Sequence, residues 1–290
     1  MRTSGSSRRR SRADRWRRGL AALALAVVTA GSSAACGSPR DASDSLLERD
    51  RVVIGVKPDQ PGLGLRTGPD RFEGFDVDVA RELAHRLGFT DDDLRFVATP
   101  SSVRERALVE HEVDLIVASY SITPQRKTVV GFAGPYYVAH QDTLVRADDT
   151  SIQDVRDLAG RRLCAVAGSN SWRRVTEERE IPAVPVPAAS YSECLTKLKR
   201  RDVDAVSTDD LILAGFAASA GEDVRILNAP FTDERYGVGI AREDVDACEE
   251  LNRAISAMYV DGTAQRLLRK WFGGTTLDLT MSVPEFEGCG

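Results

Sequence analysis

The stretch at residues 114–127, DLIVASYSITPQRK, is the most informative part of this chain. Its apolar residues 115–118 predict a buried strand, and a Ser-Tyr-Ser turn then leads directly into a helix. Thr123 suits the N-cap and Pro124 the first helical position, so Arg126 falls in the first turn. Backbone N–H groups, hydroxyls and a guanidinium would converge there, which favours a bound anion. An ordinary strand–turn–helix with a solvated arginine is the simpler alternative.

The first 35 residues predict an export signal and not part of the fold. Eight arginines lie between Arg2 and Arg18, the apolar run 20–30 follows, and small residues lead to Cys36. The apolar run is too short to span a bilayer as a helix. Residues 33–36 resemble the processing site of bacterial lipoproteins. We therefore expect Cys36 to be lipidated and to anchor the protein at the outer face of the cell membrane; plain signal cleavage is the alternative.

Charge narrows the possible partners. Residues 1–35 carry eight Arg and one Asp, so removing them changes the formal net charge from −5 to −12. Such an acidic domain is a poor candidate for nucleic-acid binding. The polar residues 36–50 predict a tether between the anchor and the fold.

Cysteine content supports export. With Cys36 lipidated, an even number of cysteines remains and no CxxC pair occurs, which favours disulfides over a metal site. The four are Cys164, Cys194, Cys248 and Cys289. The most local pairing joins Cys164 to Cys194 and leaves Cys248 with Cys289 to fasten the C-terminal tail. The other two connectivities, and four free thiols, stay open.

Apolar periodicity predicts strands that alternate with helices along residues 52–271, hence an α/β protein with mostly parallel sheets flanked by helices. The predicted strands are 52–56, 94–97, 113–118, 142–145, 162–167, 184–186, 205–206 and 236–241. The predicted helices are 76–87, 103–110, 126–130, 155–158, 172–178, 192–200, 210–220, 245–260 and 264–271.

Length suits two domains. We expect a first lobe of residues 51–139 and 236–275, a second lobe of residues 140–235 inserted into it, and a C-terminal tail of residues 276–290. Two segments would then cross between the lobes and act as a hinge.

Seven segments resemble the family-3 extracellular solute-binding proteins, the receptors of ATP-driven importers of polar amino acids. They are GFDVDVA (74–80), VDLIVASYSITPQRK (113–127), FAGPYY (132–137), DLAGRRLCAVAGSNS (157–171), DVDAVSTDD (202–210), YGVGI (236–240) and DGTAQRLLRKWFG (261–273). Their order and spacing make the match specific over residues 51–273. VKPDQPGLGLR at 56–66 is most similar to the glutamate-binding lipoproteins of actinobacteria. The resemblance implies the two-lobed type II fold of periplasmic-binding proteins.

The resemblance also implies how the common groups of an amino acid are bound. Arg126 would bind the α-carboxylate, with help from Ser121 and the backbone after Ser119. Ser119 would offer its carbonyl to the ammonium group, and Asp209 would be the ammonium counter-ion.

Asn170 and Ser171 would close on the ligand from the second lobe. Both residue types are also common in turns without such a role, and Asp209 also suits an N-cap. Structural roles therefore stay open for these three residues.

Side-chain selectivity is implied at other positions. Lys57 stands where glutamine-binding relatives tend to carry an acid and binders of acidic amino acids a base. Ser101 and Arg104 stand where glutamate and aspartate binders use Ser and Arg. Two cations aimed at the distal end of the ligand favour a second carboxylate, because burying them unpaired is costly; each could also be a solvated surface charge. Further candidates are Arg66, Gln60 and Phe75.

We therefore expect a monomeric, cofactor-free and metal-free receptor that captures L-glutamate, with aspartate, asparagine and glutamine as competitors, and delivers it to the permease subunits of an ABC importer. A sensor that signals to a membrane partner would have the same ligand site. A dehydratase of the same fold needs an acid or base in the cleft. The histidines, His85, His111 and His140, fall on helices or a lobe edge, and neither GxSxG nor HExxH occurs. We therefore expect no catalysis.

Overall fold

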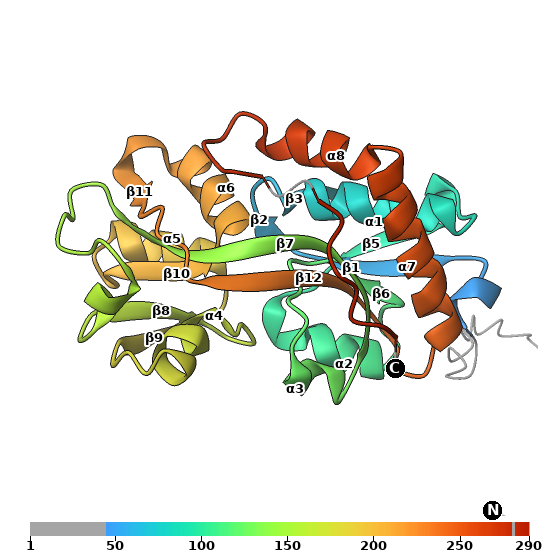
Figure 1. Cartoon of the computed structure of the whole chain (residues 1–290), viewed down its shortest axis with the longest axis horizontal. Coiled ribbons are helices and arrows are strands. Elements are labelled where there is room, and N and C mark those ends of the chain that lie inside the picture. Colours follow the sequence, from blue (N-terminus) through green and yellow to red (C-terminus); the bar gives the residue numbers. More distant parts are fainter. Residues whose placement is uncertain (1–44, 280–281, 290) are drawn as a thin grey trace, which may run out of the picture. The chain divides into compact units, whose positions relative to one another are not determined.

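The computed structural model describes residues 45–279 and 282–289. The predicted export signal and Cys36 lie outside these residues. A nine-stranded mixed sheet organises the described chain (Figure 1). In spatial order its strands are β5 (Leu94–Ala98), β1 (Val52–Val56), β6 (Leu115–Ile116), β12 (Thr232–Ile240), β7 (Gly131–Arg146), β10 (Ala205–Asp209), β8 (Arg162–Val166) and β9 (Val184–Ala188), and β11 (Val224–Ile226) also pairs with β7.

Two groups of parallel strands are joined by one antiparallel pair. β1 runs parallel to β5 and β6, and β8 runs parallel to β9 and β10. Between the groups, β7 and β12 pair from Thr232–Gln141 to Ile240–Gly131. We call the β1 group and its helices the first lobe, and the β8 group and its helices the second lobe.

The crossing strands lie side by side at the predicted lobe boundary. Glu234 is opposite Ala139 and Arg235 is opposite Val138, so both predicted crossing points fall at one level of the sheet. The register shifts between Tyr236 and Val238. The exact residue limits of the lobes stay a prediction.

Strand β1 explains why the sheet is covered on both faces. Val52, Ile54 and Val56 belong to the largest core cluster, whereas Val53 points into a separate cluster on the opposite face. This alternation follows from the two-residue repeat of a strand, and an apolar residue at every position is typical of a parallel strand buried on both faces.

Helices cover both faces of the sheet (Figure 1). The largest core cluster draws residues from five helices: α1 (Phe75–Arg86), α5 (Tyr191–Lys199), α6 (Asp210–Ala220), α7 (Val245–Val260) and α8 (Thr263–Phe272). The smaller clusters draw on α2 (Arg104–Val109) in the first lobe and on η4 (Val155–Leu158) and η5 (Arg174–Glu178) in the second. The remaining α-helices are α3 (Pro124–Lys127) and α4 (Ser171–Arg173). Within the described ranges, no helix is long and apolar enough to span a bilayer.

Several predicted elements differ from the structure. The strand predicted at 113–118 pairs only at β6, and the strand predicted at 142–145 is the end of β7, which begins at Gly131. The helix predicted at 172–178 is one α turn followed by a π turn. A small antiparallel sheet of β2 (Asp59–Gln60), β3 (Gly64–Gly68) and β4 (Arg71–Glu73) was not predicted, because its Gly- and Pro-rich sequence lacks strand periodicity.

Both predicted disulfides are confirmed. Cys164 on β8 is bonded to Cys194 on α5, and Cys248 on α7 is bonded to Cys289 in the tail. The tail is also fixed by Glu287, which pairs with Arg235 on β12 at 3.0 Å. The described cysteines are therefore not free thiols.

The end of the predicted tether packs on the fold. η1 (Leu46–Glu48) buries Leu46, which is 2% exposed. Asp244 accepts hydrogen bonds from the Ser45 hydroxyl and the Leu46 N–H, both at 2.7 Å. The fold therefore includes residues before position 51, where the first lobe was predicted to begin.

Candidate functional site

Polar side chains from both lobes line a small cavity that the protein's own atoms nearly fill. The first lobe contributes the ends of β1 and β6 and the start of α2, and the second lobe contributes the turn after β8, the end of β10 and the starts of α5 and α6. The lining residues are Lys57, Ser101, Arg104, Ser119, Ser121, Ser169, Asn170, Ser171, Tyr191, Asp209 and Ile212. Eight of these were predicted as ligand-binding residues.

The turn after β6 is held by a buried carboxylate that the sequence analysis missed. Asp76, in the first turn of α1, accepts hydrogen bonds from the Ser119 N–H at 2.7 Å and from the Tyr136 hydroxyl at 2.8 Å. Ser119 has a φ of 44°, an unusual value for a non-glycine residue, and the bond to Asp76 holds this conformation. Burial raises the pKa of the Asp76 carboxyl to about 7. The segment GFDVDVA contained the signal, an acid at a helix start within an otherwise apolar run.

Two cations are buried without a carboxylate partner. Lys57 and Arg104 are each 2% exposed, and neither forms an ion pair with any side chain in residues 45–279 or 282–289. The Lys57 ammonium donates a short hydrogen bond to the Ser101 hydroxyl. Burial, and then the nearby Arg104 charge, hold the pKa of Lys57 well below its usual value. The alternative of solvated surface charges is therefore wrong for both cations.

Arg104 is only partly satisfied by the protein. Its Nη1 donates to the Ala118 carbonyl at 3.1 Å and its Nη2 to the Gly168 carbonyl at 3.4 Å, but its buried Nε has no hydrogen-bond partner within the described chain. The guanidinium also lies 4.2 Å from the centre of the Tyr120 ring. This arrangement places a positive charge with spare donor capacity at the cavity.

Arg126 lies beside the cavity and does not line it. Its Nη1 donates to the Ser121 carbonyl at 2.6 Å, its Nη2 donates to the Gly168 carbonyl at 3.3 Å, and its Nε is 3.2 Å from Glu105. The guanidinium is also 4.9 Å from the Tyr120 ring centre. Burial, and then the Arg104 charge, lower the pKa of Arg126 to about 10.

A second cleft, which also contains Ser169 and Asn170, is the one that Arg126 lines. The predicted helix start is confirmed, because the Thr123 hydroxyl caps α3 at the Arg126 N–H and Pro124 is its first residue.

Asp209 supplies the acidic side of the cavity. It ends β10 and is 4% exposed, and it accepts a hydrogen bond from the Tyr236 hydroxyl at 2.6 Å. Burial, and then the negative charge of Glu234, raise the pKa of Asp209 well above its usual value. Its side chain makes no capping hydrogen bond to α6, although it precedes that helix. The N-cap alternative therefore does not explain this carboxylate.

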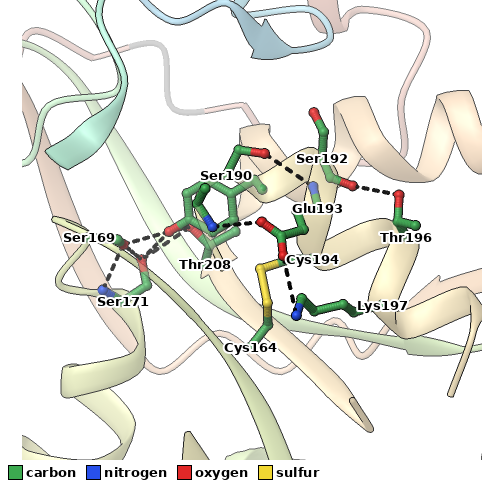
Figure 2. Close-up of a disulfide and its surroundings, with 12 residues drawn as sticks. Cys164, Ser169, Ser171, Ser190, Ser192, Glu193, Cys194, Thr196, Lys197 and Thr208 are labelled. Carbon is green, nitrogen blue, oxygen red and sulfur yellow. Dashed lines mark hydrogen bonds and ion pairs between the residues drawn. A yellow bond between two sulfur atoms is a disulfide. The ribbon is translucent and has the colours of Figure 1, made fainter. Parts of the chain in front are cut away.

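A hydroxyl cluster fixes the turn of the second lobe. The Tyr191 hydroxyl lies 2.6 Å from the Ser169 hydroxyl, 3.0 Å from that of Ser171 and 2.9 Å from that of Thr208. Figure 2 shows Ser169, Ser171 and Thr208 gathered on one side of the Cys164–Cys194 disulfide. Tyr191 is the first residue of α5. The disulfide from Cys194 to Cys164 therefore also holds the Tyr191 hydroxyl near β8. Sequence reasoning missed Tyr191 because its partners are 17 to 22 residues away.

Asn170 has a partner on the crossing strand. Its Nδ2 donates to Glu234 at 3.3 Å, and Arg174 donates to the same carboxylate at 2.8 Å. Glu234 is almost completely buried on β12. The turn at residues 168–171 is therefore tied to the strand that joins the two lobes.

Three further candidates do not line the cavity. Gln60 is buried next to it and accepts a hydrogen bond from the Ser119 hydroxyl at 2.9 Å. Phe75 lies in the core, with its ring 6.1 Å from those of Tyr136 and Tyr137. Arg66 is exposed and donates to the carbonyls of Gly68 and Pro69. A ligand role for these three stays a prediction.

Histidines and metal clusters do not contribute to this cavity. Of the described residues that line it, none is a histidine. His85 is 3.3 Å from Asp91, and His140 is 2.9 Å from Asp233, on other parts of the surface. No three His, Cys, Asp or Glu side chains of residues 45–279 and 282–289 gather so as to hold a metal ion.

The sheet order and the cavity between two lobes define the type II fold of periplasmic-binding proteins. The chain belongs to family 3 of the bacterial extracellular solute-binding proteins, whose model matches residues 52–274. This confirms the family predicted from the sequence.

Named relatives and solved structures agree with this family. Glutamate-binding protein GluB of Corynebacterium efficiens is 40% identical over 269 residues, which cover 88% of this chain and 90% of that protein. The ABC transporter glutamine-binding protein GlnH of Bacillus subtilis is 31% identical over 236 residues, which cover 81% and 85%. An ancestral arginine-binding protein bound to glutamine superposes with a TM-score of 0.72 at 28% identity, and the match covers 78% of this chain and 99% of that one.

Proposed function

We propose that this protein is an extracytoplasmic receptor for an acidic amino acid, L-glutamate in the first place, and that it delivers the ligand to an ABC importer. The family is one of extracellular solute-binding proteins, and relatives named for glutamate and glutamine binding support an amino-acid ligand. Aspartate, asparagine and glutamine are the competitors that the same site would bind less tightly.

The pair of buried cations at one end of the cavity carries the proposal. An uncompensated buried charge is strongly unfavourable, so a site that keeps Lys57 and Arg104 without a carboxylate partner is built for an anionic group of the ligand. Glutamine would offer this end of the cavity a neutral amide instead. We therefore assign Lys57, Arg104 and Ser101 to the side-chain carboxylate of the ligand.

The remaining charges match the other two groups of an amino acid. Asp209 is the counter-ion of the ammonium group, helped by the Ser119 carbonyl. Ser121 and the turn of Asn170 and Ser171 bind the α-carboxylate in the cavity, and Arg126 reaches it from the adjoining cleft that it shares with Asn170. In the structure the Gly168 carbonyl is the shared acceptor of Arg104 and Arg126, at 3.4 and 3.3 Å. A neutral carbonyl satisfies two guanidiniums poorly, and this supports a carboxylate of the ligand at each of them.

Binding would proceed by closure of the two lobes. A ligand bound to the first lobe gains contacts with Asp209 and residues 168–171 only when the second lobe approaches, so the ligand shifts the population toward the closed form. Permease subunits would recognise that form. We further propose that Cys36 is lipidated and holds the monomeric receptor at the membrane surface.

Calorimetric titration of the purified protein, freed of co-purified ligand by unfolding and refolding, tests the assignment. We expect L-glutamate to bind with a Kd at or below about 1 µM, which corresponds to about −8 kcal/mol, and L-glutamine at least about tenfold more weakly. L-Arginine is the matched control, because it places a cation next to Lys57 and Arg104. Tight binding of arginine without binding of glutamate would refute an acidic ligand.

A further inference from the structure

A glycine in the middle of α6 has no backbone reason to be there. Gly215 is buried inside this helix and its φ is in the ordinary range. Glycine is a poor helix former compared with alanine, so such a position needs another explanation. A Cβ at this position would lie 1.9 Å from the carbonyl oxygen of Pro61 and 2.9 Å from its carbonyl carbon. These are backbone atoms that cannot rotate away, so only glycine allows this approach.

Pro61 belongs to the first lobe and Gly215 to the second. Pro61 follows β2 in the turn that leads to β3, directly after Gln60 at the end of β2. The buried Gln60 accepts a hydrogen bond from the hydroxyl of Ser119, at 2.9 Å. Residues 60 and 61 therefore contact Ser119 of the first lobe and α6 of the second lobe.

A second contact joins the same turn to α5. The Ser192 hydroxyl donates to the Asp59 carbonyl at 3.0 Å, and the Ser192 N–H donates to the Asp59 carboxylate at 3.2 Å. Figure 2 shows Ser192 in the first turn of α5, next to the cap Ser190 and close to the disulfide of Cys194. The covalent bond to β8 thus fixes the helix end that meets Asp59.

We propose that the Pro61–Gly215 and Asp59–Ser192 contacts form a closing seam, present when the lobes meet over the ligand and released when they separate. The inference rests on the proposed function, because it assumes capture by closure. In this seam Gly215 is a positioning residue and touches no ligand group. Because it has no side chain, the lobes can approach far enough for Asp209 and residues 168–171 to reach the ligand. A side chain that prevents these contacts from forming disfavours the closed form and lowers the apparent affinity for the ligand.

The substitution Gly215→Ala separates this role from an ordinary packing role. We expect the affinity for L-glutamate, measured by calorimetric titration, to fall at least about tenfold, since closure is blocked. In the open form the added methyl has no Pro61 neighbour and alanine is the better helix former. The melting temperature of the ligand-free protein should therefore stay the same or rise by about 2–4 °C. Ser219→Ala, on the exposed side of the same helix, is the matched control and should leave the affinity unchanged.

The second contact is tested in the same way. Ser192→Ala removes the hydroxyl donor to Asp59 and should weaken glutamate binding about fivefold, as expected for one hydrogen bond. Thr196→Ala, one turn further along α5, removes a hydroxyl that bonds only within the helix and should change the affinity less than about twofold.

The outcomes separate the seam from the proposed function. If the wild type binds glutamate and Gly215→Ala binds it equally well, the seam is refuted and the function stands. A ligand-free Gly215→Ala protein that melts well below the wild type also refutes the seam, because the contact would then be permanent packing. If the wild type binds another amino acid, the function is wrong as stated, and the same comparison with that amino acid decides the seam. If it binds no amino acid, both fail.

Discussion

At the scale of single residues, Lys57 is a buried ammonium group with one hydroxyl partner. Its desolvation is unfavourable for the folded protein, and the neighbouring Arg104 adds repulsion. Such an arrangement is typical of a binding site. The ligand-free protein is less stable because the charge is unpaired, and a negatively charged group of the ligand then supplies the partner. Lys57 is therefore expected to raise the affinity for the ligand and to lower the stability of the ligand-free protein.

Lys57→Met should lower the affinity for glutamate about 100-fold but the affinity for glutamine less than about tenfold, because only glutamate loses a charge partner. The ligand-free variant should also be more stable than the wild type in urea, since a desolvated charge is gone. Lys199→Met, at an exposed ion pair with Asp223, is the control for a lost surface lysine. An equal decrease in affinity for glutamate and glutamine would show that Lys57 does not bind the side-chain carboxylate.

Asp76 predicts how stability depends on pH. Its pKa is about 7 in the folded protein and close to 3.8 when unfolded, so the folded state keeps a proton that the unfolded state has lost. One such proton corresponds to about 1.4 kcal/mol per pH unit, so the contribution of Asp76 to the free energy of unfolding should decrease by a few kcal/mol, roughly, as the pH rises from 4 to 7. Asp209 and Asp210, whose pKa values burial also raises, act in the same direction.

Asp76→Asn isolates this contribution. Urea unfolding of ligand-free protein at pH 4, 5.5 and 7 should give a smaller decrease for the variant than for the wild type, whatever its absolute stability. Asp202→Asn, at an exposed site, should reproduce the wild-type decrease. Parallel curves for Asp76→Asn and the wild type would mean that Asp76 is ionised throughout this range.

At the scale of elements, the strand that begins at Gly131 shows where local pattern stops being informative. Residues 131–141 were not predicted as a strand because they contain Gly134, Pro135 and no apolar/polar alternation. In the structure they form β7, which pairs with β12 over most of its length. Long-range pairing thus overrode local propensity. Helix α6, in contrast, has the predicted limits of 210–220, because its apolar run is long enough to indicate a buried helix from the local sequence.

The Cys164–Cys194 disulfide is expected to stabilise both the fold and the site. Replacing both cysteines by serine should lower the free energy of unfolding by about 3–4 kcal/mol, from the entropy of closing a loop with a sequence separation of 30. Glutamate affinity should fall too, because α5 carries Tyr191 and Ser192.

Removing Cys248 and Cys289 together is the control, since that bond joins α7 to the tail and not to the cavity. It should reduce stability and leave affinity within about twofold of the wild type. Equal affinities for both double variants would contradict a role of α5 in binding.

At the scale of the whole molecule, the two lobes share one core on one face of the sheet and have separate cores on the other. The adjacent strands β7 and β12 are the continuous connection between the lobes. A bend of these two strands would open the cavity without breaking either small core, which is consistent with closure by a hinge.

Small-angle scattering checks this motion. The radius of gyration of the wild type should decrease when glutamate is added. Asp209→Asn, which removes the proposed ammonium counter-ion from the second lobe, should show no decrease at the same glutamate concentration. Asp202→Asn, on the surface of the same lobe, should behave like the wild type. A wild-type radius that does not change while glutamate binds would show that the lobes do not move.

Sequence alone determined the strand and helix alternation and the helix start at Thr123 and Pro124. It favoured the disulfide pairs that the structure shows, and the family resemblance implied eight residues of the cavity lining. The alternation and the helix start follow from local periodicity and caps, the favoured disulfide pairing follows from short loop closure, and the lining residues follow from the order of the family's motifs. Tertiary structure alone decided that Asp76 supports Ser119, that Arg126 stands beside the cavity, and that Gly215 meets Pro61. The partners in these contacts are 43, 42 and 154 positions apart, for Asp76 with Ser119, Arg126 with Gly168, and Pro61 with Gly215. No local pattern encodes such distances, because packing of the whole chain brings these partners together.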